Sequence, residues 1–119
     1  MRSLFIVDDS SLIIERLLAM LEGLLPPEQI AFARSYGEAL SLIGICPPDI
    51  LLLDVHLPDK SGVELLRVVR KRYPEVIVIM ISNQSDESYR SVCASLGALR
   101  FLDKSTEFDE IPALIESLL

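Results

Sequence analysis

The side chains best suited to chemistry stand directly after short aliphatic runs of this sequence. They are, in chain order, Asp8 and Asp9, Asp54, Ser82, and the pair Asp103-Lys104. Grouped carboxylates bind hard divalent cations such as Mg²⁺, which prefer oxygen ligands. A carboxylate nucleophile, a metal ion, a lysine and a hydroxyl donor are the parts that phosphoryl transfer requires. The pattern therefore predicts phosphoryl chemistry, provided that the fold brings these residues together.

The aliphatic runs that precede these residues have the length and composition of buried β-strands. Their apolarity is continuous rather than alternating, which is typical of a parallel sheet covered on both faces. We expect strands at residues 4–7, 50–53, 76–81 and 99–102, with a weaker candidate at 29–34.

Segments with helical periodicity lie between the strand candidates. Residues 11–25 place a row of apolar side chains on one face, and Pro26-Pro27 is expected to end that helix. Two capping-box spacings predict further helix starts. These boxes are Ser35 with Glu38 and Ser61 with Glu64. The second box begins the helix expected over 63–73, and the remaining helices are expected over 86–96 and from about Asp109.

This alternation predicts an α/β fold: a flavodoxin-like, doubly wound, five-stranded parallel sheet of order 2-1-3-4-5 with five helices. The carboxyl ends of parallel strands meet at one edge of the sheet. Asp54 should therefore lie one strand spacing, about 5 Å, from the strand that ends at Asp8 and Asp9. Ser82 arrives on the other side of Asp54, and the long stem of Lys104 can cross two strand spacings. We expect residues 1–119 to form a single domain.

The composition narrows the class of protein. The chain has 119 residues, 50% of them hydrophobic, and a formal net charge of −7. So acidic a chain is repelled by phosphate backbones and anionic lipids, which disfavours direct binding to nucleic acid or membranes. Two cysteines, Cys46 and Cys93, indicate neither a disulfide scaffold nor a zinc site, and both are expected to be inert packing residues. No secretory leader is visible, so we expect a cytoplasmic protein.

These residues together resemble the receiver domain of two-component response regulators, in the CheY-like superfamily. The resemblance extends over essentially the whole chain. It rests on Asp8-Asp9, Asp54 followed by Leu57-Pro58 and Gly62, Ser82, and Gly97-Ala98 followed by Phe101 and Lys104. It implies that Asp54 accepts a phosphoryl group from the phosphohistidine of a sensor histidine kinase or phosphotransfer protein.

The same resemblance implies a role for each site residue. Asp9 and Asp54 would bind Mg²⁺, or Mn²⁺ in its place, together with the backbone carbonyl of His56, while Asp8 would act through water. Ser82 and Lys104 would contact the phosphoryl oxygens. Phe101 stands at the position of the switch aromatic, and the fourth helix, fifth strand and fifth helix would form the output face. The chain would catalyse only its own phosphorylation and dephosphorylation, as a monomer or weak dimer, and act on an unidentified downstream protein.

The sequence departs from the family pattern at a few positions. Ser105 follows Lys104 where the family usually has proline, and Asn83 stands where a small residue is usual. His56 and Gln84 occupy positions that tune dephosphorylation in this family, so the lifetime of the phosphoryl group is left open. The chain is either a stand-alone receiver or a piece of a longer regulator cut after its last helix.

Two other functions stay open alongside the receiver. One is a pseudo-receiver that binds a partner without phosphorylation, and the other is a small phosphatase of the haloacid-dehalogenase type. Taken singly, each site residue also has an ordinary structural role. Asp8-Asp9-Ser10-Ser11 can simply cap a helix, and Lys104 can be a solvated lysine.

Overall fold

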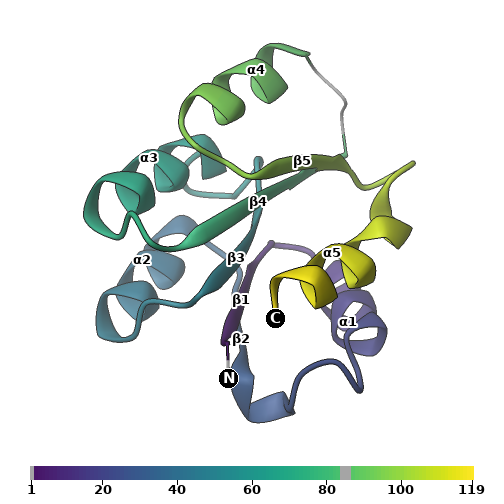
Figure 1. Ribbon diagram of the computed structural model, residues 1–119. Coiled ribbons are helices and arrows are strands. Elements are labelled where there is room, and N and C mark those ends of the chain that lie inside the picture. Colours follow the sequence, from purple (N-terminus) through teal and green to yellow (C-terminus); the bar gives the residue numbers. More distant parts are fainter. Residues whose placement is uncertain (1, 84–86) are drawn as a thin grey trace.

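The structure, a computed structural model, describes residues 2–83 and 87–119 and contains a parallel sheet. The sheet has five strands in the order β2-β1-β3-β4-β5 (Figure 1), which confirms the predicted fold and strand order. The strands are β1 (Leu4–Val7), β2 (Ile30–Ala33), β3 (Ile50–Asp54), β4 (Ile77–Ser82) and β5 (Arg100–Asp103).

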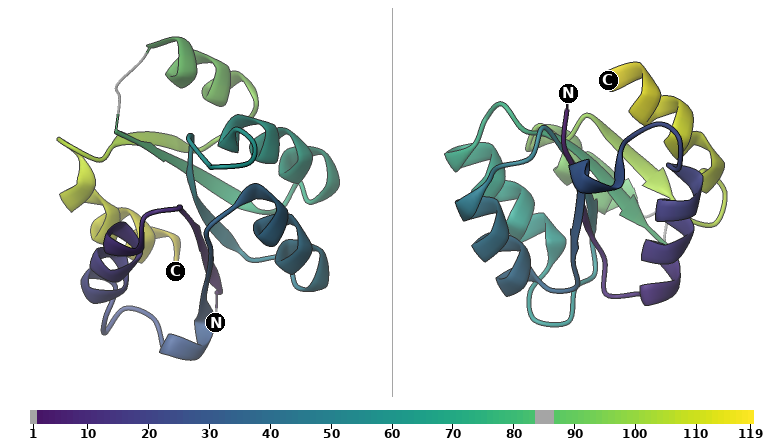
Figure 2. Two further views of the ribbon diagram at one scale, coloured as in Figure 1. Left: turned by 180° about the vertical axis from the view of Figure 1, so that it is seen from behind. Right: turned by 90° about the horizontal axis from the view of Figure 1, so that it is seen from below.

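Helices cover both faces of the sheet. They are α1 (Ser11–Met20), α2 (Tyr36–Ile45), α3 (Gly62–Arg72), α4 (Glu87–Ser95) and α5 (Ile111–Leu118), with short 3₁₀ turns η1 (Pro27–Gln29) and η2 (Phe108–Glu110). Helices α2, α3 and α4 lie on one face, and α1 and α5 lie on the other (Figures 1 and 2). None of the helices in 2–83 and 87–119 is long and apolar enough to cross a bilayer.

The central strand β3 explains why the aliphatic runs are continuous. Its successive side chains point to opposite faces, so Leu51 and Leu53 join the core under α2 and α3. Ile50 and Leu52 join the second core, under α1 and α5. Because both faces are covered, β3 needs apolar residues at the positions before Asp54. The packing of these residues on both sides holds the end of β3, and with it Asp54, in a fixed position.

The prediction that the first helix runs to residue 25 is wrong. Helix α1 ends at Met20, and a turn follows in which Gly23 adopts a φ of 88°. Leu21 and Leu25 are nevertheless buried. The apolar pattern therefore predicted correctly that these residues are buried, but not that they are helical. The break comes before Pro26-Pro27, and glycine is the residue that takes this left-handed conformation at low cost.

Other boundaries differ from the predicted ones by about one residue. Asp54, Ser82 and Asp103 are the last residues of β3, β4 and β5 rather than the first residues beyond them. Helix α4 is described from Glu87, so the predicted start at residue 86 lies outside the described part. The last helix was expected from about Asp109; it is preceded by η2 and begins at Ile111, with Pro112 in its first turn.

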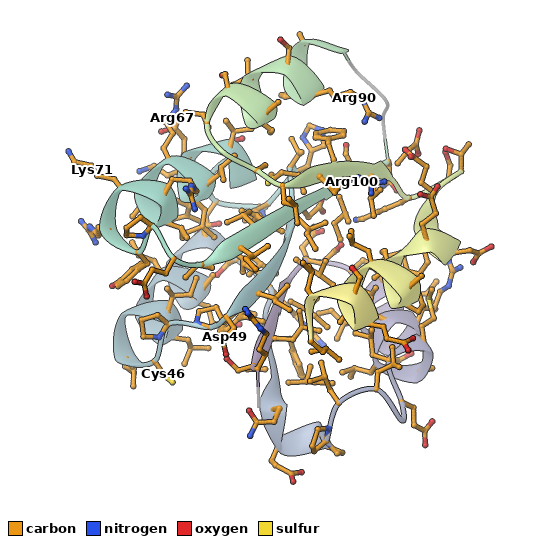
Figure 3. All side chains as sticks on the ribbon, in the orientation of Figure 1. Cys46, Asp49, Arg67, Lys71, Arg90 and Arg100 are labelled. Atoms are coloured by element: carbon orange, nitrogen blue, oxygen red, sulfur yellow. The ribbon has the colours of Figure 1, made fainter. Side chains whose placement is uncertain are left out.

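The two cysteines have different environments. Cys93 is buried in the core under α3 and α4, as predicted. Cys46 is exposed at the end of α2, so the prediction that it packs internally is wrong (Figure 3). It follows the last turn of α2, where the chain leaves the core toward Pro47-Pro48.

Candidate functional site

The carboxyl ends of the strands bring the predicted site residues to one edge of the sheet. Asp54 pairs in register with Ile81, and Ser82 pairs with Asp103, so β3, β4 and β5 end side by side. Asp8 directly follows β1 on the other flank of β3. Residues far apart in the sequence therefore share one location.

Asp8, Asp9 and Asp54 form a group of three carboxylates at this edge. Each offers an oxygen, and these oxygens all lie within 4.8 Å of one another. Asp8 and Asp54 are buried, whereas Asp9 is exposed to solvent. Three carboxylates at this separation repel one another unless a cation compensates them.

Lys104, the residue that follows β5, supplies part of the positive charge that these carboxylates need. Its Nζ lies 2.6 Å from Asp8 Oδ2 and 3.3 Å from Asp54 Oδ2. The Lys104 side chain is only 4% exposed. The interpretation of Lys104 as a solvated lysine is therefore wrong. Its long stem crosses two strand spacings to Asp54 as predicted, and it also reaches Asp8, which was not predicted.

The donor set at this edge fits a divalent cation. Among the described residues, Asp8 Oδ2 is a buried oxygen without a hydrogen bond of acceptable geometry, although the Lys104 ammonium is close. One ammonium beside three carboxylates leaves negative charge uncompensated. Oxygen donors with this charge are the ligands that Mg²⁺ and Mn²⁺ prefer.

Burial raises the pKa of Asp54 above its ordinary value of 3.8. The Asp8 carboxylate raises it further, while the Lys104 ammonium and the amide of His56 oppose the shift. Asp54 is thus a carboxylate whose negative charge is poorly solvated, which favours its reaction with an electrophile or its pairing with a cation.

Ser10 performs the capping role that the two aspartates were also able to take. It is the N-cap of α1, and its Oγ accepts a hydrogen bond of 3.3 Å from the amide of Ile13. The amide of Ser10 in turn donates to Asp8 Oδ1 at 2.9 Å. Asp8 is oriented by this bond, and its second oxygen faces Lys104.

The loop after β3 packs directly against the Asp54 backbone. The amide of Gly62 donates to the carbonyl of Val55 at 2.7 Å, and Ser61 Oγ donates to the same carbonyl at 3.4 Å. A Cβ on Gly62 would overlap the Asp54 carbonyl oxygen. The amide of His56 donates to Asp54 Oδ1 at 3.4 Å. Position 62 requires glycine, because any side chain there would collide with the Asp54 backbone.

The His56 side chain is exposed and contacts α4. Its ring meets the Tyr89 ring edge-on, with 5.6 Å between the centroids. Asn83 is exposed at the end of β4, and Gln84 lies outside the described residues. The peptide between Lys104 and Ser105 is trans.

Ser82 and Phe101 lie on the two strands farthest from β1. Ser82 is fully buried, and its backbone carbonyl accepts a hydrogen bond of 2.7 Å from the amide of Lys104. Phe101 is buried below α4, and the Arg90 guanidinium lies 5.0 Å from its ring centroid. Arg90 also donates to the Phe101 carbonyl at 2.8 Å and pairs with Glu107 at 3.6 Å (Figure 3).

Sequence reasoning missed two groups of residues around the site. One is Asp59, which binds the amides of Tyr36 and Gly37 at the start of α2. The other is Arg90 with Glu107, whose Oε1 also accepts a hydrogen bond of 3.1 Å from the amide of Asp103. Each is a contact between elements distant in sequence, so local spacing carries no signal for it.

Comparison with known proteins identifies the class of this chain. The model of the response regulator receiver domain family matches residues 4–116. The chain therefore belongs to this family.

Named relatives agree with this class. The transcriptional regulatory protein DegU of Brevibacillus brevis is 34% identical over 116 residues, which is 95% of this chain and 47% of DegU. The DNA-binding transcriptional activator EvgA of Escherichia coli strain K12 is 35% identical over 81 residues, or 68% of this chain and 40% of EvgA. The chain thus spans less than half the length of these two relatives.

A solved structure shows the same fold. It is the signal receiver domain of a DNA-binding response regulator (merR) from Colwellia psychrerythraea 34H, with a TM-score of 0.90 and 23% identity. The match covers 99% of this chain and 98% of that one.

Proposed function

We propose that residues 1–119 form one receiver domain of a two-component signalling system, in which Asp54 is the phosphoacceptor. The observation that carries this proposal is the Lys104 ammonium, buried between Asp8 and Asp54 at distances of 2.6 and 3.3 Å. Burying a lysine beside a carboxylate of raised pKa disfavours folding. Such arrangements are typical of functional sites, and here the lysine is placed to stabilise negative charge that is added at Asp54.

The reaction is a phosphoryl transfer from a phosphohistidine on a sensor histidine kinase or phosphotransfer protein. The Asp54 carboxylate oxygen attacks phosphorus, forming an O–P bond as the P–N bond breaks, and the electron pair goes to the ring nitrogen. Lys104 stabilises the phosphoryl oxygens by charge, and the hydroxyl of Ser82 donates to them. Later attack by water releases phosphate and restores the carboxylate.

The three carboxylates would hold a divalent cation. Asp9 and Asp54, with the backbone carbonyl of His56, would hold Mg²⁺ or Mn²⁺, and Asp8 would act through water. Asp8, Asp9 and Asp54 lie close enough together to share an ion. When bound, the ion neutralises charge that develops on the transferring phosphoryl group.

Phosphorylation changes the balance of contacts at the end of β5. Asp54 gains charge and acceptor oxygens, which compete with Asp8 for the Lys104 ammonium and attract Ser82. This biases β4, β5 and Phe101, and with them the face formed by α4, β5 and α5. That face binds an unidentified downstream protein in the cytoplasm, without direct contact to nucleic acid or membrane.

Acetyl phosphate tests the proposal without a kinase. Wild-type protein with Mg²⁺ should gain the mass of one phosphoryl group as the P–O bond to acetate breaks. Asp54→Asn should gain none, and chelation of Mg²⁺ should stop the reaction. Asp49→Asn, which changes an aspartate at the opposite edge of the sheet, should react like wild type.

The other outcomes of this experiment assign the remaining functions. A wild-type chain that gains no phosphoryl mass and binds no Mg²⁺ contradicts the proposal and favours a pseudo-receiver. Multiple-turnover hydrolysis of phosphate monoesters favours a phosphatase. The half-life of the acyl phosphate in wild type, compared with its half-life in variants of His56 and Gln84, measures what these two positions contribute to dephosphorylation.

A further inference from the structure

Asp59 joins the loop that follows Asp54 to the first turn of α2. Its Oδ1 accepts a hydrogen bond of 2.8 Å from the amide of Tyr36, and its Oδ2 accepts one of 2.9 Å from Gly37. The next residue, Lys60, places its ammonium 4.9 Å from the centroid of the Tyr36 ring. Two consecutive loop residues therefore contact the same turn of a helix that is distant in sequence.

The contact satisfies a need of the helix. The first amides of an α-helix lack partners within the helix itself. Ser35 serves one of them, because its Oγ accepts from the amide of Glu38 at 3.1 Å, whereas the Ala39 amide already has its regular helical partner in the Ser35 carbonyl at 3.0 Å. Asp59 serves the two amides that precede these, and its negative charge is also favoured at the positive end of the helix.

The loop is fixed at its ends by other bonds. The amide of Val55 donates to the Ile81 carbonyl at 3.1 Å, and Gly62 donates to the Val55 carbonyl at 2.7 Å. Asp59 lies between these anchors, three residues after His56. It therefore holds the middle of the loop against α2, while Val55 and Gly62 hold the ends against the sheet.

We propose that Asp59 is a positioning residue for the candidate metal site, holding the loop so that the His56 carbonyl completes the ligand set of Asp9 and Asp54. This inference rests on the proposed function. Mg²⁺ demands near-ideal coordination geometry, so a small shift of one backbone ligand weakens binding. By thermodynamic linkage, an ion bound at the site in turn strengthens the contact between Asp59 and α2.

Two alanine variants test the proposal. Asp59→Ala removes both bonds to α2, and Asp49→Ala removes a comparable bond of 2.7 Å to the amide of Ser3 (Figure 3 labels Asp49). With Mn²⁺ as the probe, followed by its electron paramagnetic resonance signal, Asp59→Ala should raise the Kd about tenfold. Asp49→Ala should leave the Kd unchanged. An Asp59→Ala chain that is folded by circular dichroism and binds Mn²⁺ like wild type overturns the proposal.

Asp59→Asn serves where Asp59→Ala does not fold. It keeps one acceptor oxygen and loses the charge, so its Kd should lie between those of wild type and Asp59→Ala. A Kd equal to that of wild type, with loss of amide protection at Tyr36 or Gly37, overturns the proposal equally.

Hydrogen exchange supplies a readout that a merely structural role does not move. In wild type, saturating Mg²⁺ should slow exchange of the Tyr36 and Gly37 amides, and in Asp59→Ala it should not. Unchanged exchange on Mg²⁺ binding overturns the inference alone. A wild type that binds Mg²⁺ but takes no phosphoryl group from acetyl phosphate overturns the proposed function alone, and one that binds neither ion overturns both.

Discussion

Lys104 lies closer to Asp8 than to Asp54, with its Nζ 2.6 Å from the first carboxylate and 3.3 Å from the second. One ammonium therefore lies beside two buried carboxylates, and its shorter contact is with the aspartate that is not the proposed phosphoacceptor. Burial raises the pKa of Asp54 above its ordinary value, and the nearby Lys104 ammonium only partly opposes this shift.

Replacing Lys104 should be costly in the absence of metal. Lys104→Met leaves Asp8 and Asp54 buried without their cation, which should lower the free energy of unfolding by about 3 kcal/mol. Urea unfolding in EDTA measures this loss, and millimolar Mg²⁺ should reduce it because a divalent cation compensates the same carboxylates. Lys71→Met, on the exposed side of α3, should change stability by less than about 0.5 kcal/mol. Equal losses in the two variants would contradict this account.

Asp54→Asn should stabilise the protein without metal at neutral pH, by on the order of 1 kcal/mol. Burial raises the pKa of Asp54 in the folded state, so the ionised carboxylate disfavours folding. Protonation removes that penalty, so wild type gains stability relative to Asp54→Asn as the pH falls through the folded-state pKa. Urea midpoints compared at neutral and acidic pH test this. A variant that is less stable than wild type at neutral pH would refute it.

Asp59 should show the opposite dependence on pH. The amides of Gly37 and Tyr36 hold its pKa below the ordinary value of 3.8, so its ionised form favours folding. This stabilisation is present above that ordinary value and is lost as the pH falls through the lower folded-state pKa. Asp59→Asn should therefore be less stable than wild type at neutral pH, with a difference in urea midpoint that shrinks on acidification. A difference independent of pH would argue against the charge.

Two glycines allow a matched comparison of backbone packing. Gly62→Ala places a Cβ on the Asp54 carbonyl oxygen, so it should cost about 3 kcal/mol and slow phosphorylation. Gly44→Ala, within α2, places its Cβ at 3.8 Å from the Tyr73 hydroxyl, an ordinary contact. It should stabilise the protein by about 0.5–1 kcal/mol through helix propensity. Thermal unfolding of both variants measures these changes in stability. A lower melting temperature indicates that the steric clash of the new Cβ dominates, and a higher one indicates that helix propensity dominates.

The cysteines should differ in their reaction with a thiol reagent. Cys46 is exposed and should react within the first fast phase, whereas burial both shields Cys93 and raises the pKa of its thiol. One thiol should react in native buffer and the second only after denaturation. Cys46→Ser should abolish the fast phase, and a Cys93→Ser variant that loses it instead would show that the packing is misassigned.

The sheet and its reactive edge could be predicted because their determinants are local and strong. Uninterrupted aliphatic runs require burial on both faces, and Asp54 and Ser82 end two of them. The parallel order then brings these residues together without further information. The approach of Lys104 to Asp54 could also be predicted, because its side chain is long enough to cross two strand spacings.

The predictions were wrong where contacts between distant parts of the chain, rather than the local sequence pattern, determine the structure. Leu21 and Leu25 continue the apolar period of α1 but are buried from a turn opened by Gly23. Cys46 follows an apolar helix and is nevertheless exposed. Asp59 gave no signal in the sequence, because its partners at the start of α2 lie 22 and 23 residues away.

Arg90 reaches from α4 to the Phe101 carbonyl, the Phe101 ring and Glu107, and Glu107 binds the amide of Asp103. A displacement of α4 that carried Arg90 with it would uncover the aromatic ring and loosen the turn beside Lys104 in the same movement. These contacts would therefore couple the two changes to each other. A ligand bound to the outer face of α4 would therefore influence Lys104 through one side chain, the Arg90 guanidinium, which pairs with Glu107 beside it.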